Sequence, residues 1–270
     1  MTENKKAIIK GLSLRLSPHQ DIVQFFGTFG SMDHDIDTVL VLKGDSSDPC
    51  NFSGLKTVMN AVQDLPETFS DQHPFSIFPS FRLQTWIEAA SLPPRTALFP
   101  RQHQSVHLLI YPDVNRLFLW ERPLLVLTLL ESLDLIFGDA DEAEQRKDGL
   151  TIPSLDQSLE YYINLVYETY QVLLASRIPE ENRLAEAFFK LKYIIKFSAL
   201  EFLYSKNRLP TPPYTVSAIQ KNLAAFRAIP LDLFDFVEQS LAASRLPEQG
   251  DLARQYERIP ALLQSMCRAT

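Results

Sequence analysis

Two aspartates separated by one residue stand at the head of an apolar segment. Asp35 and Asp37 flank Ile36 and precede the run Thr-Val-Leu-Val-Leu. Alternate side chains of an extended strand project from the same face, so these two carboxylates can share one divalent cation. Like charges held side by side destabilise a strand unless a cation or a basic group neutralises them. The pair therefore predicts a Mg²⁺ (or Mn²⁺) site, with a solvated turn before a strand as the alternative.

The order of residues around the aspartates separates several motif classes. An EF-hand calcium loop that began at Asp33 would need a glycine where Thr38 stands and a glutamate where Gly44 stands, so this class is excluded. Aspartyl-phosphate phosphatases and sugar-nucleotide glycosyltransferases carry Asp-x-Asp at the end of an apolar strand. Here the apolar run follows the acids, which disfavours both classes.

The pattern resembles the nucleotidyltransferase superfamily of the DNA polymerase β type. Its members have a strand that ends in Gly-Ser, a short connection, and a strand that begins Asp-hydrophobic-Asp. Gly30-Ser31 and Asp35-Ile36-Asp37 match this motif within residues 21–43. The connection is shorter here than in the family; using Gly27-Thr28 as the Gly-Ser equivalent lengthens it but weakens the residue match. The resemblance implies that Gly30 and Ser31 contact a triphosphate, and that Asp35 and Asp37 hold Mg²⁺.

The resemblance also implies a third acid on a later strand, which completes the metal site and activates the acceptor hydroxyl. In the strand expected at residues 106–111, His107 stands at that position, and the nearest carboxylates are Glu88 and Asp113. His107 is a candidate base or metal ligand, with a purely structural histidine as the alternative. A site without the third acid would belong to a degenerate enzyme.

Lys192 and Lys196 lie four residues apart in a helical segment, so they share one helix face. Like charges at this spacing destabilise a helix by roughly 0.2–0.5 kcal/mol unless a negative group lies opposite. Poly(A) polymerases and oligoadenylate synthetases in the same superfamily use a lysine on a comparable helix for the β- and γ-phosphates. The resemblance thus implies a triphosphate contact, and a solvated helix edge is the alternative.

The elements that position these residues change in character along the chain. β-branched and aromatic segments with alternating polarity predict a mixed sheet, joined by one helix at residues 53–65. We expect its strands at residues 21–30, 36–42, 81–87, 106–111 and 116–120. After Pro123 the apolar residues recur at three- and four-residue spacing, which is typical of helices. Two long helices are expected at 155–173 and 184–202, shorter ones at 216–227, 231–244 and 251–268, and a charged loop or hinge at 138–153.

The sequence thus predicts an α+β fold: a nucleotidyltransferase-like domain with a mixed β-sheet at residues 1–122, a helical domain at 123–270, and a site in the cleft between them. The function implied is Mg²⁺-dependent transfer of a nucleoside monophosphate from a nucleoside triphosphate to an acceptor hydroxyl, with release of pyrophosphate. The alternative is a degenerate relative that binds nucleotide or protein without catalysis.

Composition sets limits on compartment and partners. The chain has 270 residues, a formal charge of −7 and 46% hydrophobic residues, values that exclude a disordered chain. Two cysteines and no recognisable secretory signal or long apolar run predict a cytoplasmic protein without a membrane anchor. The acidic charge favours a small molecule or a protein over a long nucleic acid as acceptor. A homo-oligomer or a protein partner is expected to use the helical domain.

Overall fold

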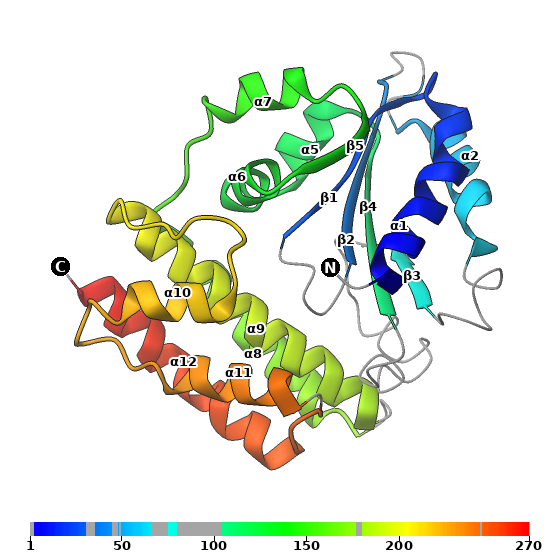
Figure 1. The fold of residues 1–270 in the computed structure, drawn as a ribbon. Coiled ribbons are helices and arrows are strands. Elements are labelled where there is room, and N and C mark those ends of the chain that lie inside the picture. Colours follow the sequence, from blue (N-terminus) through cyan, green and yellow to red (C-terminus); the bar gives the residue numbers. More distant parts are fainter. Residues whose placement is uncertain are drawn as a thin grey trace. The chain divides into compact units, whose positions relative to one another are not determined.

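The structure, a computed structural model, describes residues 3–30, 36–44, 48, 50–65, 75–79, 104–176, 180–243 and 245–269 (Figure 1). The chain divides into two compact units: Met1–Arg82 with Gln102–Thr151, and Leu83–Arg101 with Ile152–Thr270. The first unit contains a mixed sheet and the second is helical in its described part, so the predicted α+β fold class is confirmed.

The first unit is built on a five-stranded sheet with the order β3-β4-β2-β1-β5. Strand β1 is antiparallel to both of its neighbours, whereas β2, β4 and β3 run parallel to one another. The strands are β1 (Val23–Phe29), β2 (Ile36–Leu42), β3 (Phe75–Pro79), β4 (Gln104–Tyr111) and β5 (Asp134–Gly138). The helices are α1 (Glu3–Leu16), α2 (Phe52–Val62), α5 (Val114–Trp120), α6 (Pro123–Glu131) and α7 (Asp141–Lys147), and a 3₁₀ turn, Ser17–His19, follows α1.

Alternation along β2 gives the sheet two apolar faces, because successive side chains of a strand point in opposite directions. Ile36 and Leu40 belong to the core formed with α1 and α2. Val39 and Val41 belong to the core formed with α5, α6 and α7. Figure 1 shows α1 and α2 on one side of the sheet and α5 and α6 on the other. Helices thus cover both faces of β2 along most of its length.

Several predicted elements are confirmed in the first unit. The strands at 21–30, 36–42 and 106–111 are β1, β2 and β4, and the helix at 53–65 is α2. The strand predicted at 81–87 lies outside the described residues. The strand predicted at 116–120 is wrong, because this segment is helix α5. Its first turn is capped by Asp113, whose carboxylate accepts the backbone N–H of Arg116 at 2.8 Å.

The segment predicted as a loop at 138–153 contains helix α7. Its first turn carries Asp141, Glu142 and Glu144, and its last turn carries Arg146 and Lys147, an order that favours a helix through the macrodipole. Strand β5 lies just before it and pairs with β1. Because of this pairing, residues 123–151, which the sequence assigned to the helical domain, belong to the compact unit of the sheet.

The second unit confirms the two long helices, as α8 (Leu155–Leu174) and α9 (Glu180–Ser205). Three further helices follow: α10 (Val216–Leu223), α11 (Asp232–Ala243) and α12 (Gln249–Arg268). The buried Tyr256 of α12 donates its hydroxyl to the Ala187 carbonyl at 2.7 Å, and burial raises the pKa of this phenol well above its usual value. Within the described ranges, no helix combines the length and apolar character needed to span a bilayer.

Gly27 allows β1 and the α6–β5 connection to approach each other closely. A Cβ atom at this position would lie 2.7 Å from Leu133 Cδ1 and 2.8 Å from the Asp134 carbonyl oxygen. We expect Gly27→Ala to lower the free energy of unfolding by roughly 1–3 kcal/mol, the usual cost of overpacking. Urea denaturation measures this change. Gly250→Ala is the matched control, because nothing lies within 4 Å of its added Cβ; equal losses in the two variants would contradict the packing argument.

Candidate functional site

Strand register brings Asp37 and His107 together at one end of the sheet. Asp37 of β2 is in register with Phe29 of β1 and with His107 of β4. Since β1 is antiparallel to β2 and β4 is parallel to it, the end of β1 and the start of β2 share a row with His107, the fourth residue of β4. Asp37 and His107 thus lie side by side on adjacent strands, which in a β-sheet are about 4.8 Å apart.

Asp37 and His107 also project from the same face of the sheet. Asp37 lies two and four residues before Val39 and Val41, and His107 lies two and four residues before Leu109 and Tyr111. Residues at this spacing in a strand point to the same face. These four apolar residues belong to or pack against the core under α5, α6 and α7, so the polar pair continues that face toward the sheet edge. Both polar residues are half-buried. The Thr38 hydroxyl donates to the His107 carbonyl at 2.9 Å, which ties β2 to β4 at this row.

Gly30 ends β1 in a left-handed conformation beside the Asp37 carboxylate. Its φ is +77°, and a Cβ atom on it would lie 3.4 Å from Asp37 Oδ2. Its backbone N–H donates to Ser132 Oγ at 3.0 Å. Gly27 and Thr28 lie inside β1, with Thr28 buried and in register with Thr38. Gly30, and not Gly27, is therefore the glycine that leads out of the strand toward Asp37.

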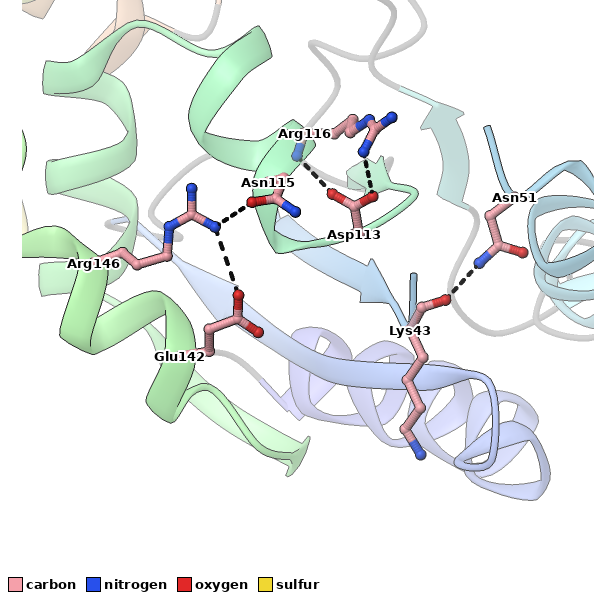
Figure 2. A network of polar contacts seen from close by, with 7 residues as sticks. All are labelled: Lys43, Asn51, Asp113, Asn115, Arg116, Glu142 and Arg146. Carbon is pink, nitrogen blue, oxygen red and sulfur yellow. Dashed lines mark hydrogen bonds and ion pairs between the residues drawn. The ribbon is translucent and has the colours of Figure 1, made fainter. Parts of the chain in front are cut away.

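Asp113 lies at the opposite end of β4 from His107. The four steps along the strand from His107 to Tyr111 alone span roughly 13 Å at ~3.3 Å per residue, and Asp113 comes two residues later. Its carboxylate accepts the backbone N–H of Arg116 and also pairs with the Arg116 guanidinium, each at 2.8 Å (Figure 2). The structure therefore does not bring Asp113 to the Asp37 row, and both of its contacts stabilise the start of α5.

At the end of the sheet near Asp113, polar side chains contact one another and the backbone and so stabilise the fold. Figure 2 shows Arg146 between the Asn115 amide oxygen and the Glu142 carboxylate, where it joins α7 to α5. The Asn51 amide donates to the Lys43 carbonyl at 2.9 Å and ties the start of α2 to the end of β2. These contacts satisfy helix ends and strand ends, which accounts for the polar residues here without a ligand.

Lys192 and Lys196 lie on α9, in the second unit. Both are half-buried, and the Lys196 ammonium lies 5.5 Å from the centre of the Phe197 ring. Their four-residue spacing places them on one side of the helix, as predicted. Ser31, Asp35 and Glu88, which the sequence also proposed, lie outside the described residues.

Asp37 and His107, in register on β2 and β4, supply one carboxylate and one imidazole as potential metal ligands. In the part of the chain that the structure describes, no group of three or more His, Cys, Asp or Glu side chains is arranged to hold a metal ion. Mg²⁺ prefers oxygen ligands and commonly completes its shell with water and substrate phosphates. Asp37 fits that preference, and a magnesium site here needs further oxygen ligands, of which Asp35 is the one predicted from sequence.

Comparison with known proteins does not identify a family. No protein-family model matches the chain, and no curated protein matches it significantly. The argument for a function therefore depends on the geometry of the edge.

Ser132 is a member of this edge that sequence reasoning missed. It follows the apolar helix α6 by one residue and reaches Gly30 only because β5 returns alongside β1. A serine after a helix is an ordinary capping residue, so its type and position carry no signal of this contact.

The positive φ of Gly30 predicts that substitutions at this position destabilise the protein according to how well they tolerate a left-handed backbone. An alanine in the left-handed region costs roughly 1–2 kcal/mol, whereas asparagine tolerates that region better. We expect Gly30→Ala to lower the free energy of unfolding by about that amount, and Gly30→Asn to lower it by less. Urea denaturation of the two variants compares them. Equal destabilisation by alanine and asparagine would show that the left-handed conformation is not what the position requires.

Proposed function

We propose that the chain is a Mg²⁺-dependent nucleotidyltransferase whose reacting centre lies at the Asp37–His107 edge of the sheet. The observation that carries the proposal is the shared row of Asp37 and His107, with the left-handed Gly30 beside the Asp37 carboxylate. The strand directions also support it. The antiparallel β1–β2 pair and the parallel β2–β4 pair give the edge at which the superfamily pattern gathers its Gly-Ser, Asp-x-Asp and third-acid positions.

The residues of the edge have separate roles in this reaction. Asp37, with Asp35, holds the cation, and the cation when bound offsets the charge of the triphosphate. The half-buried His107, when neutral, accepts the proton of the acceptor hydroxyl. The acceptor oxygen then forms a bond to the α-phosphorus, the bond from that phosphorus to the bridging oxygen breaks, and pyrophosphate leaves. Glu88 remains the alternative proton acceptor proposed from sequence, whereas Asp113 is committed to the cap of α5.

A second candidate function is nucleotide binding without catalysis. It is favoured by the imidazole of His107 at the position where the superfamily carries its third carboxylate. It is also favoured by the Gly30 N–H, which donates to Ser132 Oγ rather than standing open to a phosphate. In this candidate the protein retains the nucleotide and its cation but transfers nothing.

The net charge of the chain supports a proposal about the acceptor, and its free cysteines support one about the cellular compartment. With 33 acidic against 26 basic residues, the chain repels a polyanion unless a local basic groove is present, so we propose a small-molecule or protein hydroxyl as acceptor. Cys50 and Cys267 are both free thiols, which fits a reducing, cytoplasmic environment. A homo-oligomer or a partner protein would bind through the helical unit.

Substitution of the proposed metal ligands should impair nucleotide binding, whereas substitution of the proposed base should impair only the transfer step. We expect Asp35→Asn/Asp37→Asn to abolish Mg²⁺-dependent binding of nucleoside triphosphates, measured by calorimetry with each of the four nucleotides. Asp113→Asn is the control and should bind like wild type, because this carboxylate lies at the other end of β4. His107→Ala should retain triphosphate binding but lose transfer of an α-³²P label to acceptors in a cell extract.

Three results would change this assignment. Metal-dependent binding that survives the double substitution removes the metal role of the two aspartates. Transfer that persists in His107→Ala shows that another group takes the proton. Binding by the wild-type chain with no transfer under Mg²⁺ or Mn²⁺ establishes the second candidate.

The lysines of α9 predict a difference between nucleotides. If they contact the β- and γ-phosphates, Lys192→Ala or Lys196→Ala should weaken ATP binding by about tenfold or more, the effect of losing a charged hydrogen bond. AMP binding should change little. Lys190→Ala is the matched control on the same helix, where the ammonium lies 5.9 Å from the centre of the Tyr193 ring. Equal loss for ATP and AMP, or none for either, would leave these lysines as surface residues.

A further inference from the structure

We infer that Ser132 is a positioning residue of the candidate site: it fixes the backbone of Gly30 and thereby the position of Gly30 beside Asp37. This inference rests on the proposed function for its consequence and on the described contacts for its geometry. Ser132 is the residue after α6 and lies at the start of the connection to β5. It contacts neither of the proposed reacting groups, Asp37 and His107, in any described hydrogen bond.

The Ser132 hydroxyl bridges a helix end and a strand end. It donates to the Thr128 carbonyl at 2.7 Å and accepts the backbone N–H of Gly30 at 3.0 Å. A hydroxyl has one proton and two lone pairs, so donating to Thr128 leaves a lone pair directed to the Gly30 amide. The two contacts are compatible and use the hydroxyl in both senses. The bridge is half-buried, where competition from water is reduced.

The bridge assigns a different role to Gly30 from the one that the resemblance implies. Because the Gly30 N–H is already donated to Ser132, an incoming phosphate cannot take it without breaking that bond. Gly30 instead contributes its left-handed backbone, which places its Cα beside the Asp37 carboxylate: a Cβ atom there would lie 3.4 Å from Asp37 Oδ2. Ser132 stabilises that backbone by holding the amide, so the shape of the turn depends on this hydroxyl.

The neighbours of Ser132 make the contact part of a packed connection. Leu133 and Asp134 lie against Gly27, three residues before Gly30, and Asp134 is in register with Thr28. The α6–β5 connection and the first residue of β5 therefore contact Gly27 inside β1 and Gly30 just after it. A shift of this connection would move Gly30 relative to Asp37, and this explains why a residue from outside the motif influences the motif.

The test compares three variants in the full chain. Ser132→Ala removes the bridge, Ser132→Thr keeps a hydroxyl that can donate to Thr128 and accept from Gly30, and Ser240→Ala is the control. Ser240 is also half-buried, and it donates to the carbonyl four residues earlier, that of Phe236, at 2.8 Å, but on α11 of the other unit. All three variants are first compared by urea denaturation to establish that each is folded.

Two readouts separate the inference from the proposed function. The first is amide hydrogen exchange at Gly30 by NMR, which should accelerate by about tenfold in Ser132→Ala, the effect of losing one hydrogen bond of ~1 kcal/mol or slightly more. The second is the Mg²⁺–ATP dissociation constant, which should rise by about fivefold to tenfold in Ser132→Ala. Ser132→Thr and Ser240→Ala should remain within about twofold of wild type in both measurements.

Each outcome decides a different point. Unchanged exchange at Gly30 in Ser132→Ala overturns the inference. So does an unchanged dissociation constant where the wild type binds Mg²⁺–ATP, and so does an equal loss of affinity in Ser132→Ala and Ser240→Ala. If the wild type binds no nucleotide, the proposed function fails. The exchange measurement still decides in that case whether Ser132 holds the turn.

Discussion

The pairing of β1 with β2 on one side and with β5 on the other determines the geometry of the candidate site. The β1–β2 register places Phe29 opposite Asp37, so the chain leaves β1 beside the Asp37 carboxylate. The β1–β5 pairing brings Ser132 to Gly30 and Leu133 to Gly27. A slip of one residue in either ladder would turn Asp37 into the opposite core or separate Ser132 from Gly30, because side chains alternate between the two faces.

The parallel direction of β2 and β4 separates the two polar ends of the sheet. Asp37 lies at the start of β2 beside His107, the fourth residue of β4, and Asp113 and Lys43 lie just after the strands end. At the second end, polar groups are satisfied by helix caps and ion pairs within the chain (Figure 2). A carboxylate near a strand is therefore a weak indication of a role, since Asp113 is close to β4 in sequence and still contributes only to the start of α5.

Local patterns predicted much of the fold, and non-local pairings account for most of what they missed. The apolar run of β2, which is buried on both faces, and the helical stripes of α8 and α9, which are buried on one, are recorded directly in the sequence. Residues 116–120 form an apolar run that periodicity alone does not assign to strand or helix, and the Asp113 cap decides for a helix. Strand β5 is short, and its place beside β1 is set by contacts about a hundred residues apart. The family resemblance implied that His107 stands at the third-acid position, and its register with Asp37 comes from the structure; the Ser132 contact had no local signal.

In the proposed function, an imidazole where the superfamily carries a third carboxylate alters the electrostatics of the edge. Three carboxylates attract a divalent cation strongly even without substrate, but they also repel the triphosphate. Asp35 and Asp37 without a third carboxylate carry one negative charge fewer, so the protein alone would attract the cation less and oppose the nucleotide less. The cation and the triphosphate are then expected to bind together, each neutralising part of the other's charge. This balance suits a site in which the described residues do not form a metal cage by themselves.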